Sequence, residues 1–365
     1  MIPYFVVFGI IAVFAILDVF DGGQELRKCI LLLFFLILCF FATMNIGDQD
    51  HANYELAFRE SIDANVLDKQ SLTGKEIYFM EPGYRLLNKL ISFFTHQSFF
   101  IFAIAAFITL FLNFKVYKKY SPYFLFSVLL YYGHIYLVRE MIQIRFGIAS
   151  AICLYSIGFI VQKRWRIFVL LVGIAAMFHT IAWVFLLMYP FYWLKMNRNN
   201  YAWMLIVCLC FAWLFPIGRM LAYLPDVSIF YKVKLYVDSQ QFNQTLGVIS
   251  NPVVLKSIIV SVVGIYFYSF LSEEYTFFRL LFAIYIFGTC WLLIFNDFSI
   301  VAGRVATLFT SSEVIIIPMY ISLLYKNLFH RILSWVVIVG YCFMTIFLNL
   351  YNGNVLPYQY WGFGI

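Results

Sequence analysis

The chain has 365 residues, of which 64% are hydrophobic and only 12% are charged, and its mean hydropathy is +0.88. Because soluble domains carry about 25% charged residues, this composition excludes an ordinary soluble protein. The formal net charge of +7 comes mostly from short clusters of Lys and Arg between apolar runs, so it indicates membrane topology and not a nucleic-acid partner.

Most of the chain consists of apolar runs near the roughly 20 residues that a membrane-spanning helix requires. We expect the first run to be a retained span, because no basic region precedes it and acidic residues follow it in place of a cleavage site. The runs cover residues 3–20, 27–43, 99–114, 122–138, 143–161, 201–217, 252–271, 277–295, 305–325 and 332–350.

A further run over residues 167–194 is too long for one untilted span and too short for two, and basic residues flank both of its ends. By the positive-inside rule both ends are cytoplasmic, so we expect a broken or half-length helix pair that enters the membrane and returns. The sequence therefore predicts one all-α, polytopic membrane domain over residues 1–365, with about eleven or twelve transmembrane helical segments.

The basic clusters at 115–119 and 163–166 set the orientation of the spans. When both are cytoplasmic, the loops 44–98 and 218–251 and the C-terminal tail face outward. Within the first of these loops, Pro82 and Gly83 predict a turn into an amphipathic helix over 84–94 that lies in the membrane interface. The predicted location is the bacterial cytoplasmic (inner) membrane, with the active site facing the periplasm.

The first outward loop carries Asp50, Tyr54, Glu81, Tyr84 and Arg85. Carboxylates and a guanidinium near an outer membrane face can serve as a base and an anion clamp for a sugar phosphate. The alternative is that a loop of this length is polar only because it must be solvated.

Arg139, Glu140 and Arg145 stand at the start of the fifth predicted span. Counting about 1.5 Å per residue from Val161 places Arg145 some 24 Å above the cytoplasmic edge, in the outer leaflet. The two arginines differ by about 120° around a continuous helix, so they face one cavity only if the helix breaks near Glu140. A salt bridge of Glu140 with either arginine is the alternative.

His179 lies inside the predicted broken pair, and Arg304 is expected to open the eleventh span from outside. A histidine at this depth has either a proton-transfer or phosphate-binding role, or it is a neutral side chain hydrogen-bonded between helices. Arg304 either binds an anion or simply extends to lipid phosphates. Neither a metal nor a cofactor is expected, since no nucleotide loop, zinc motif or spaced cysteine pair is present.

At these residues the chain resembles the EpsG-like branch of the Wzy-type polysaccharide polymerases. The matching segments keep the family's order along most of the chain: GDQDHANYELAF from 47, EPGYRLLNKL from 81, REMIQIRFGIASAICLYSIGFI from 139, AAMFHTIAWVFLLMYP from 175, AGRVATLFTSSEVIIIP from 302 and NVLPY from 354. The resemblance implies that Asp50, Arg145, His179 and Arg304 occupy recurrent polar positions, and that the fold is like that of GT-C glycosyltransferases.

The expected function is polymerisation of undecaprenyl-diphosphate-linked oligosaccharide repeats into O-antigen or exopolysaccharide by a membrane glycosyltransferase. Asp50, Glu140 or His179 would deprotonate the acceptor hydroxyl, and Arg139, Arg145 and Arg304 would bind the diphosphate with residues of the first loop. A flippase or transporter of the same lipid, or an O-antigen ligase, remains as an alternative. Expected partners are the lipid bilayer, a chain-length regulator and the pathway's flippase, without any nucleic acid.

Overall fold

The computed structural model describes residues 1–20, 24–66, 68, 72–215, 220, 245–325 and 327–362. Regular structure in these residues is helical, apart from one isolated antiparallel bridge between Asn45 and Tyr360. Most of the predicted outward loop 218–251 lies outside the described residues. The chain divides into two compact units, Met1–Trp183 with Ile321–Ile365, and Val184–Tyr320.

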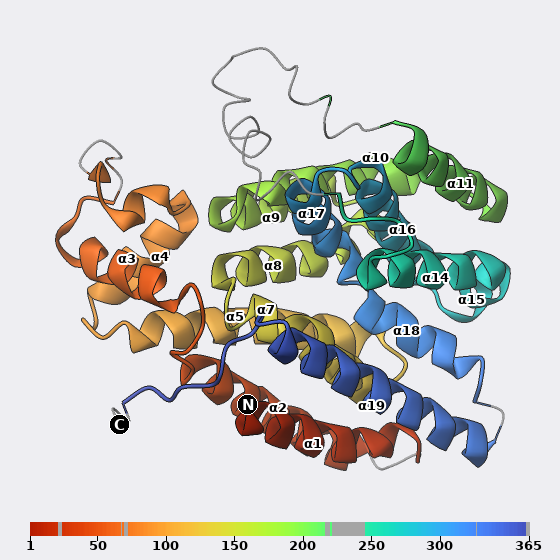
Figure 1. Cartoon of the computed structure of the whole chain (residues 1–365), viewed down its shortest axis with the longest axis horizontal. Helices are drawn as coiled ribbons and strands as arrows, with labels where there is room; N and C mark the ends of the chain where they lie inside the picture. The colour runs from red at the N-terminus through yellow and green to blue at the C-terminus, as the bar shows by residue number, and fades with distance from the viewer. Residues whose placement is uncertain are drawn as a thin grey trace. The chain divides into compact units, whose positions relative to one another are not determined.

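The first unit contains the N-terminal helices together with the last one, α19. Within it, α3 and α4 lie side by side at one end, beyond the ends of the longer helices (Figure 1). Its elements are α1 Ile2–Ala15, η1 Ile16–Asp18, α2 Gln24–Thr43, α3 His51–Asp63, η3 Glu76–Phe79, α4 Pro82–Ser92, α5 Phe99–Tyr120, α6 Phe124–Tyr131, η4 Tyr132–Tyr136, α7 Leu137–Arg139, α8 Ile144–Val161, α9 Trp165–Phe178 and α19 Leu328–Tyr351.

The second unit is built around α16, which packs against α11, α14 and α17. Close packing of α16 on α17 depends on Gly288, where a Cβ atom would lie 2.7 Å from the Cβ of Phe309. The elements are η5 Thr180–Leu187, which enters from the first unit, α10 Met188–Trp193, α11 Arg198–Leu214, α14 Pro252–Tyr266, α15 Tyr268–Glu274, α16 Phe278–Ile294, α17 Ser299–Thr310 and α18 Glu313–Ser322, which leads back to the first unit.

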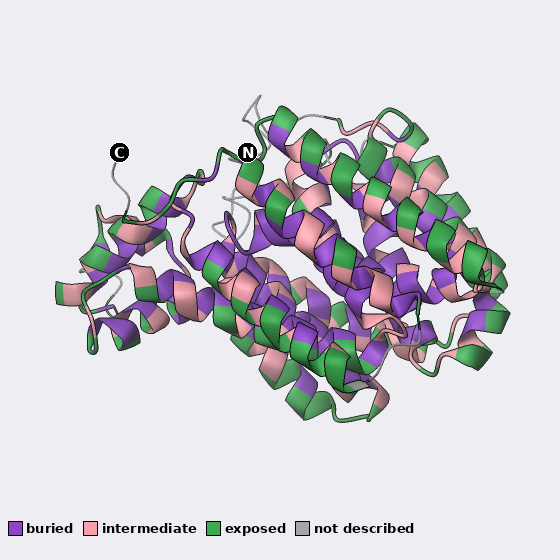
Figure 2. Ribbon diagram, turned by 90° about the horizontal axis from the view of Figure 1, so that it is seen from below, coloured by how far each residue is buried: buried purple, intermediate pink, exposed green. Residues whose placement is uncertain are grey.

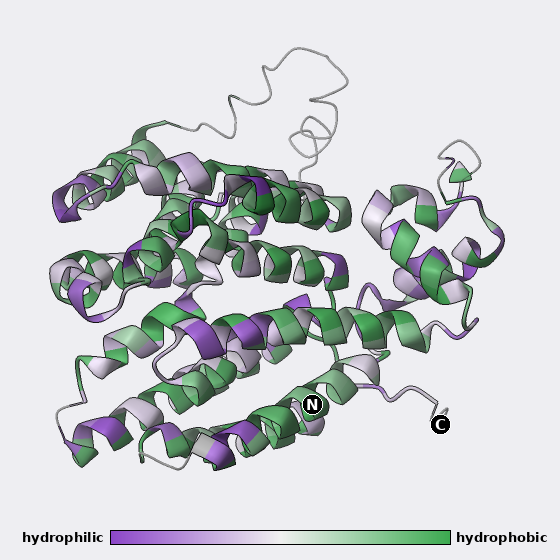
Figure 3. Ribbon diagram, turned by 180° about the vertical axis from the view of Figure 1, so that it is seen from behind, coloured by the Kyte–Doolittle hydropathy of each residue, from purple (hydrophilic) through white to green (hydrophobic). Residues whose placement is uncertain are grey.

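Four described helices are long and apolar enough to cross a membrane, and two bent pairs raise this number to six. The bends are 74° between α14 and α15 and 52° between α17 and α18. Five shorter apolar helices of 10–17 residues accompany them in the described part of the chain. Figure 3 shows hydrophobic residues along these helices and more hydrophilic ones over α3 and α4. An all-α, polytopic membrane protein with broken helices is thus confirmed.

The long helices of the first unit differ in how much of their surface is covered by protein. Within the span of α8, 72% of residues are buried, against 33% in α2 and 22% in α19. Exposed residues on α19 and α2 include large apolar side chains such as Val337 and Leu36 (Figure 2). Because lipid can cover such faces, α2 and α19 are suited to the lipid boundary, whereas α8 lies inside its unit.

Asp18 anchors the first span on the N-terminus of α6. Its buried carboxylate accepts backbone N–H groups from Leu125 and Phe126 at 2.7 and 3.1 Å. These donors belong to the first turn of a helix, which has no intrahelical acceptor for them. Asp18 therefore caps a helix that begins more than 100 residues later.

Some predicted helix boundaries are wrong. Arg304 does not open a span but lies in the middle of α17. The single spans expected over 252–271 and 305–325 each contain a sharp bend. Such bends depend on tertiary packing that hydropathy does not report. The amphipathic helix expected over 84–94 is confirmed as α4, although it begins and ends two residues earlier.

Candidate functional site

The helix α4 turns its polar side inward and its apolar side outward. Tyr84, Arg85 and Asn88 are buried, whereas Leu90 and Phe93 are exposed. This is the reverse of a helix on a soluble protein, and it fits a helix that contacts lipid on its outer side. The arrangement places a buried polar surface at the α3–α4 end of the first unit.

Arg145 on α8 reaches this polar surface and joins it to α4. Its Nη1 atom donates to the carboxylate of Glu81, the residue that precedes α4. The guanidinium also lies 5.7 Å from the ring centroid of Tyr54 on α3, and Tyr54 packs edge-on against Tyr84 at 5.5 Å. Three separate segments of the chain therefore meet at Arg145.

Burial and charge both act on Tyr54. Burial raises the pKa of its hydroxyl to about 12, against a lowering effect from Arg145, and both Asp50 and Asp48 raise it further. Tyr54 is therefore protonated at neutral pH and can donate a hydrogen bond. The same electrostatic contacts place Asp48 and Asp50 beside the Tyr54–Arg145 pair.

The helix is broken between Arg139 and Arg145, which is the condition that the sequence sets for the two arginines to face one cavity. The helix α7 ends at Arg139, residues 140–143 form a turn, and α8 starts at Ile144. The guanidinium of Arg139 lies 3.9 Å from the ring centroid of Phe146, and it donates to the side chain of Gln143. This arginine is 8% exposed, so it is held inside the unit next to the first turn of α8.

The predicted break at His179 is also present. Helix α9 ends at Phe178, His179 has extended backbone angles, and a 3-10 helix follows. A Cβ atom on Gly173 would lie 3.8 Å from the ring of Trp183, ten residues later. Since ten residues of continuous helix extend about 15 Å, the chain must turn back after α9. The ring of His179 packs edge-on against Phe146 at 5.1 Å, so Phe146 contacts both His179 and Arg139.

Two glycines allow the backbones around the cluster to approach closely. A Cβ atom on Gly83 would lie 2.8 Å from the carbonyl oxygen of Met177, which fixes the start of α4 on the end of α9. A Cβ atom on Gly147 would lie 2.6 Å from the carbonyl oxygen of Arg139. Gly83 and Gly147 both lie in segments that resemble the EpsG-like family. Each allows a close backbone contact that brings candidate residues nearer to one another.

Several guanidinium nitrogen atoms in this cluster have no hydrogen-bond acceptor among the described residues. They are Nε of Arg145 and both Nε and Nη1 of Arg85, and all three atoms are buried. Arg85 is 7% exposed and lies one helical turn after Glu81. A buried N–H group without an acceptor is costly, more so when it is charged. The cluster therefore suits a ligand with several negatively charged oxygens.

A second polar group lies beside the cluster, where the C-terminal tail packs on the first loop. His51 stacks on Phe102 at 4.2 Å and contacts Trp361 at 5.4 Å, and Asp48 lies 3.8 Å from its Nδ1 atom. Burial raises the pKa of Asp48 to about 7 and lowers the pKa of His51 to about 4. Asp48 also accepts the backbone N–H of Asp50 at 3.0 Å.

Glu140 lies in the turn between α7 and α8, where its side chain is engaged by a tyrosine. Its side chain is buried and accepts a hydrogen bond from the hydroxyl of Tyr131. Arg304 is an exposed residue of α17 in the second unit. The remaining sequence-predicted residues of the first unit form two sets of contacts from neighbouring positions of α8. Around Arg145 lie Asp50, Tyr54, Glu81 and Tyr84. Around Phe146 lie Arg139 and His179. Arg85 is buried on α4, one turn after Glu81.

Sequence reasoning missed Asn88 and Phe146 as site residues, and it noted Asp48 only as one of the carboxylates of the first loop. Asn88 is fully buried and interacts with Tyr84, and its position four residues after Tyr84 on one helix face would have indicated it. Nothing in the sequence separates Asp48 from Asp50, because burial sets their difference. In the described part of the chain, no group of three or more His, Cys, Asp or Glu side chains is placed to hold a metal ion.

The sequence model of the EpsG family matches residues 28–360. The chain belongs to the EpsG family. A curated protein similar to this EpsG-family chain is the amylovoran biosynthesis protein AmsC of Erwinia amylovora, 29% identical over 254 residues. That alignment covers 65% of this chain and 64% of AmsC. No solved structure matches the chain.

The match confirms the resemblance to the EpsG family. Together with the apolar helices, it fits a multi-pass protein of the inner membrane. The likeness to GT-C glycosyltransferases and the outward-facing orientation of the site stay predictions.

Proposed function

We propose that this EpsG-family protein is a glycosyltransferase that polymerises lipid-diphosphate-linked oligosaccharide repeats into a surface polysaccharide at the outer face of the inner membrane. The observation that carries the proposal is the set of buried guanidinium donors without acceptors on Arg85 and Arg145. A diphosphate supplies several charged oxygens, and guanidinium groups bind them in pairs. AmsC, named as a polysaccharide biosynthesis protein, supports the same class of product.

The reaction transfers a glycan from its diphosphate to a hydroxyl of a second lipid-linked repeat. The acceptor oxygen forms a bond to the anomeric carbon, the bond from that carbon to the diphosphate oxygen breaks, and polyprenyl diphosphate leaves with the electron pair. The hydroxyl proton goes to a base on the enzyme. Arg145, Arg85 and Arg139 would stabilise the departing diphosphate, because their donors are already held in place.

We assign the base to Asp50. Its carboxylate precedes α3 beside Tyr54, and Asp48 fixes its backbone by accepting its N–H. Glu140 is less suited, because it is buried and engaged by Tyr131. In this assignment Tyr54 and Tyr84, which are protonated, orient the sugar or the diphosphate by hydrogen bonds.

His179 has a different role in this proposal. The backbone N–H of Ile181 donates to its Nδ1 atom at 3.4 Å, so in the neutral ring the proton is on Nε2. Such a ring donates a hydrogen bond to a ligand and does not take a proton from it. His179 would therefore hold a phosphate or sugar oxygen.

The proposal is tested by a gel of surface polysaccharide from a strain that lacks the gene. Loss of a polymerase leaves single repeats attached to the lipid anchor, since transport and ligation continue. Loss of a flippase leaves no repeats at the surface, and loss of a ligase leaves polymer that never reaches the anchor. Either of the last two patterns contradicts the proposal.

A further inference from the structure

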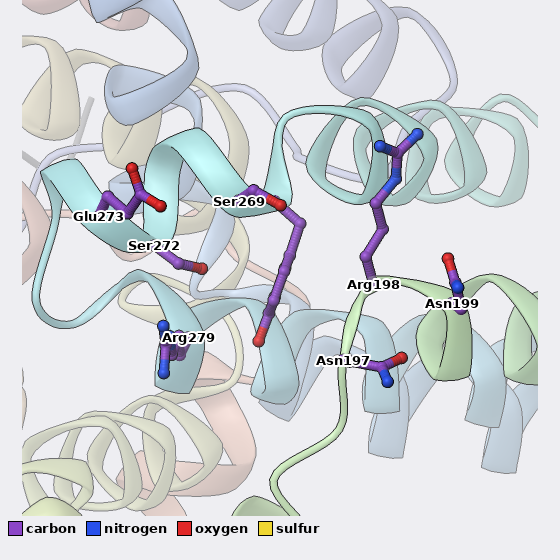
Figure 4. Close-up of a pocket in the computed structure, with 8 residues that line it drawn as sticks. Asn197, Arg198, Asn199, Ser269, Ser272, Glu273 and Arg279 are labelled. Atoms are coloured by element: carbon purple, nitrogen blue, oxygen red, sulfur yellow. The ribbon is translucent and has the colours of Figure 1, made fainter.

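The second unit contains a polar cavity that none of the proposed catalytic residues lines. One lobe has a volume of about 370 Å³ and lies between the start of α11 and the α15–α16 turn, where Asn197, Arg198, Ser269, Ser272, Glu273 and Arg279 line it (Figure 4). A second lobe of the same volume shares Asn197, Tyr268 and Arg279 with the first. The two lobes therefore adjoin each other at these three side chains, and we call them together the recess.

The recess carries excess positive charge. Arg198 and Arg279 line the first lobe, Lys195 lines the second, and Glu273 is the acidic residue among them. Among the described residues no carboxylate forms an ion pair with either arginine. Figure 4 shows the two guanidinium groups on different helices, with Ser269 between them and Ser272 beside Arg279. The guanidinium of Arg198 extends away from Arg279 and lies 5.8 Å from the ring centroid of Tyr266. Arg279 and the neighbouring Ser272 together offer guanidinium and hydroxyl donors that suit a phosphate group.

The second lobe adds aromatic surface to this polar site. Tyr192 and Trp193 end α10, and their ring centroids lie 5.4 Å apart. Tyr201 packs on Tyr268 at 5.5 Å. Tyrosine and tryptophan beside basic residues are typical of the headgroup level of a membrane. The basic residues also belong to connections that the sequence predicts to be cytoplasmic, on the side opposite to the proposed reaction.

We propose that this recess binds a phosphate ester, with the phosphate beside Arg279 and Ser272, Arg198 adding positive charge at the rim, and the apolar part against the aromatic lobe. The phosphate is either that of an anionic lipid headgroup or that of a small soluble molecule, because both present the same oxygens. Its site lies outside the proposed diphosphate cluster, so the inference stands whether or not the polymerase assignment is correct.

The experiment uses the purified full chain in phosphatidylcholine nanodiscs and follows its thermal unfolding. One arm adds phosphatidylglycerol to the disc lipid, and the other adds inorganic phosphate or glycerol 3-phosphate in solution. The test variant is R198Q/R279Q. The control is R164Q/R166Q, which removes the same charge from two exposed arginines at the start of α9 that are also predicted to be cytoplasmic.

We expect wild type and R164Q/R166Q to be stabilised equally by one of the two probes, and R198Q/R279Q to bind that probe at least about tenfold more weakly. Stabilisation by phosphatidylglycerol alone identifies a lipid headgroup, and stabilisation by the soluble probes identifies a free phosphate. E273Q should bind more tightly than wild type, because it removes the opposing charge, and it keeps the test valid if the double variant fails to fold. No stabilisation of wild type by either probe, or equal losses in both double variants, would overturn the proposal.

Discussion

Arg145 on α8 donates a hydrogen bond to Glu81 at the start of α4, and 64 residues separate the two along the chain. The side chains are 23% and 15% exposed, so the pair is largely protected from solvent screening. The pair connects α8, the most buried of the candidate spans in the described residues, to α4, whose exposed side is apolar and suits lipid. A ligand that binds the free Nε of Arg145 would therefore contact the side chain that joins α8 to the start of α4.

The first prediction concerns the planar donors of Arg145. Arg145→Lys should lose most long-chain polymer at normal protein level, because an ammonium cannot bind Glu81, Tyr54 and a diphosphate together. Arg145→Ala should be at least as damaging. The measurement is polysaccharide length on a gel beside an immunoblot of the membrane fraction.

An exposed pair on α3 serves as the matched control. Arg59 donates to Glu55 at 2.6 Å, but its side chain is 68% exposed. Exposed ion pairs contribute at most about 1 kcal/mol. Arg59→Lys should therefore leave polymer length unchanged, and a loss equal to that of Arg145→Lys would show that any change near α3 and α4 is damaging.

Gly83→Ala tests the close approach of α4 to α9. The new methyl group would lie 2.8 Å from the backbone of Met177, and overpacking of this kind costs about 1–3 kcal/mol. We expect a lower melting temperature and shorter polymer. Gly340→Ala in α19 meets no atom within 4 Å and should be neutral or slightly stabilising, since alanine favours a helix. Equal behaviour of the two variants would contradict the packing argument.

The sequence alone predicts the chain break at His179, and it makes a cavity shared by Arg139 and Arg145 conditional on a second break near Glu140, for physical reasons. Two buried arginines six residues apart can face one cavity only if the helix between them stops, and the basic ends around His179 require a turn back. The contact of Asp18 with Leu125 and Phe126, the burial of Asp48 and the place of Arg304 inside α17 are not predictable in this way. They depend on which helices become neighbours, and hydropathy does not encode that.

Asp48 and His51 should give the stability of the protein opposite dependences on pH. Burial raises the pKa of Asp48 from 3.8 to about 7, so its contribution is present below pH 3.8 and is lost as the pH rises toward 7. Burial lowers the pKa of His51 from 6.5 to about 4, so its contribution is present above pH 6.5 and is lost as the pH falls toward 4. Between pH 4 and 6.5 the two trends oppose each other.

Single variants should separate these trends. In Asp48→Asn only His51 remains, so the melting temperature should rise between pH 4 and 6.5. In His51→Gln it should fall over the same range. Each change is on the order of 3 kcal/mol, since the interval covers about 2.5 pKa units and one pKa unit corresponds to about 1.4 kcal/mol. Parallel pH profiles for both variants and wild type would show that neither group titrates differently in the folded protein.

His179 should tolerate a substitute that keeps a donor. Because its Nδ1 accepts the N–H of Ile181, the ring offers Nε2–H to a ligand. His179→Gln should keep more polymer than His179→Phe, which preserves the contact with Phe146 but has no donor. If Gln and Phe are equally inactive and wild-type activity falls below pH 6.5, the ring acts as a base.

Cysteine labelling tests the orientation of the membrane segments. Thr73→Cys, an exposed position in the first loop, should react with an impermeant maleimide in intact cells. Arg164→Cys should react only after the membrane is permeabilised. Cys29 and Cys210, which are exposed, are first replaced by Ser. The reverse pattern would place the Arg145 cluster on the cytoplasmic side.

The central claim is tested most directly with the purified protein in liposomes that contain a polyprenyl-diphosphate-linked repeat. The account predicts a ladder of lengthened glycans and one polyprenyl diphosphate released for each bond formed. Arg145→Lys should give neither product at equal protein, whereas Arg59→Lys should give both. Movement of the lipid-linked repeat across the bilayer with no ladder, or a full ladder from Arg145→Lys, would contradict it.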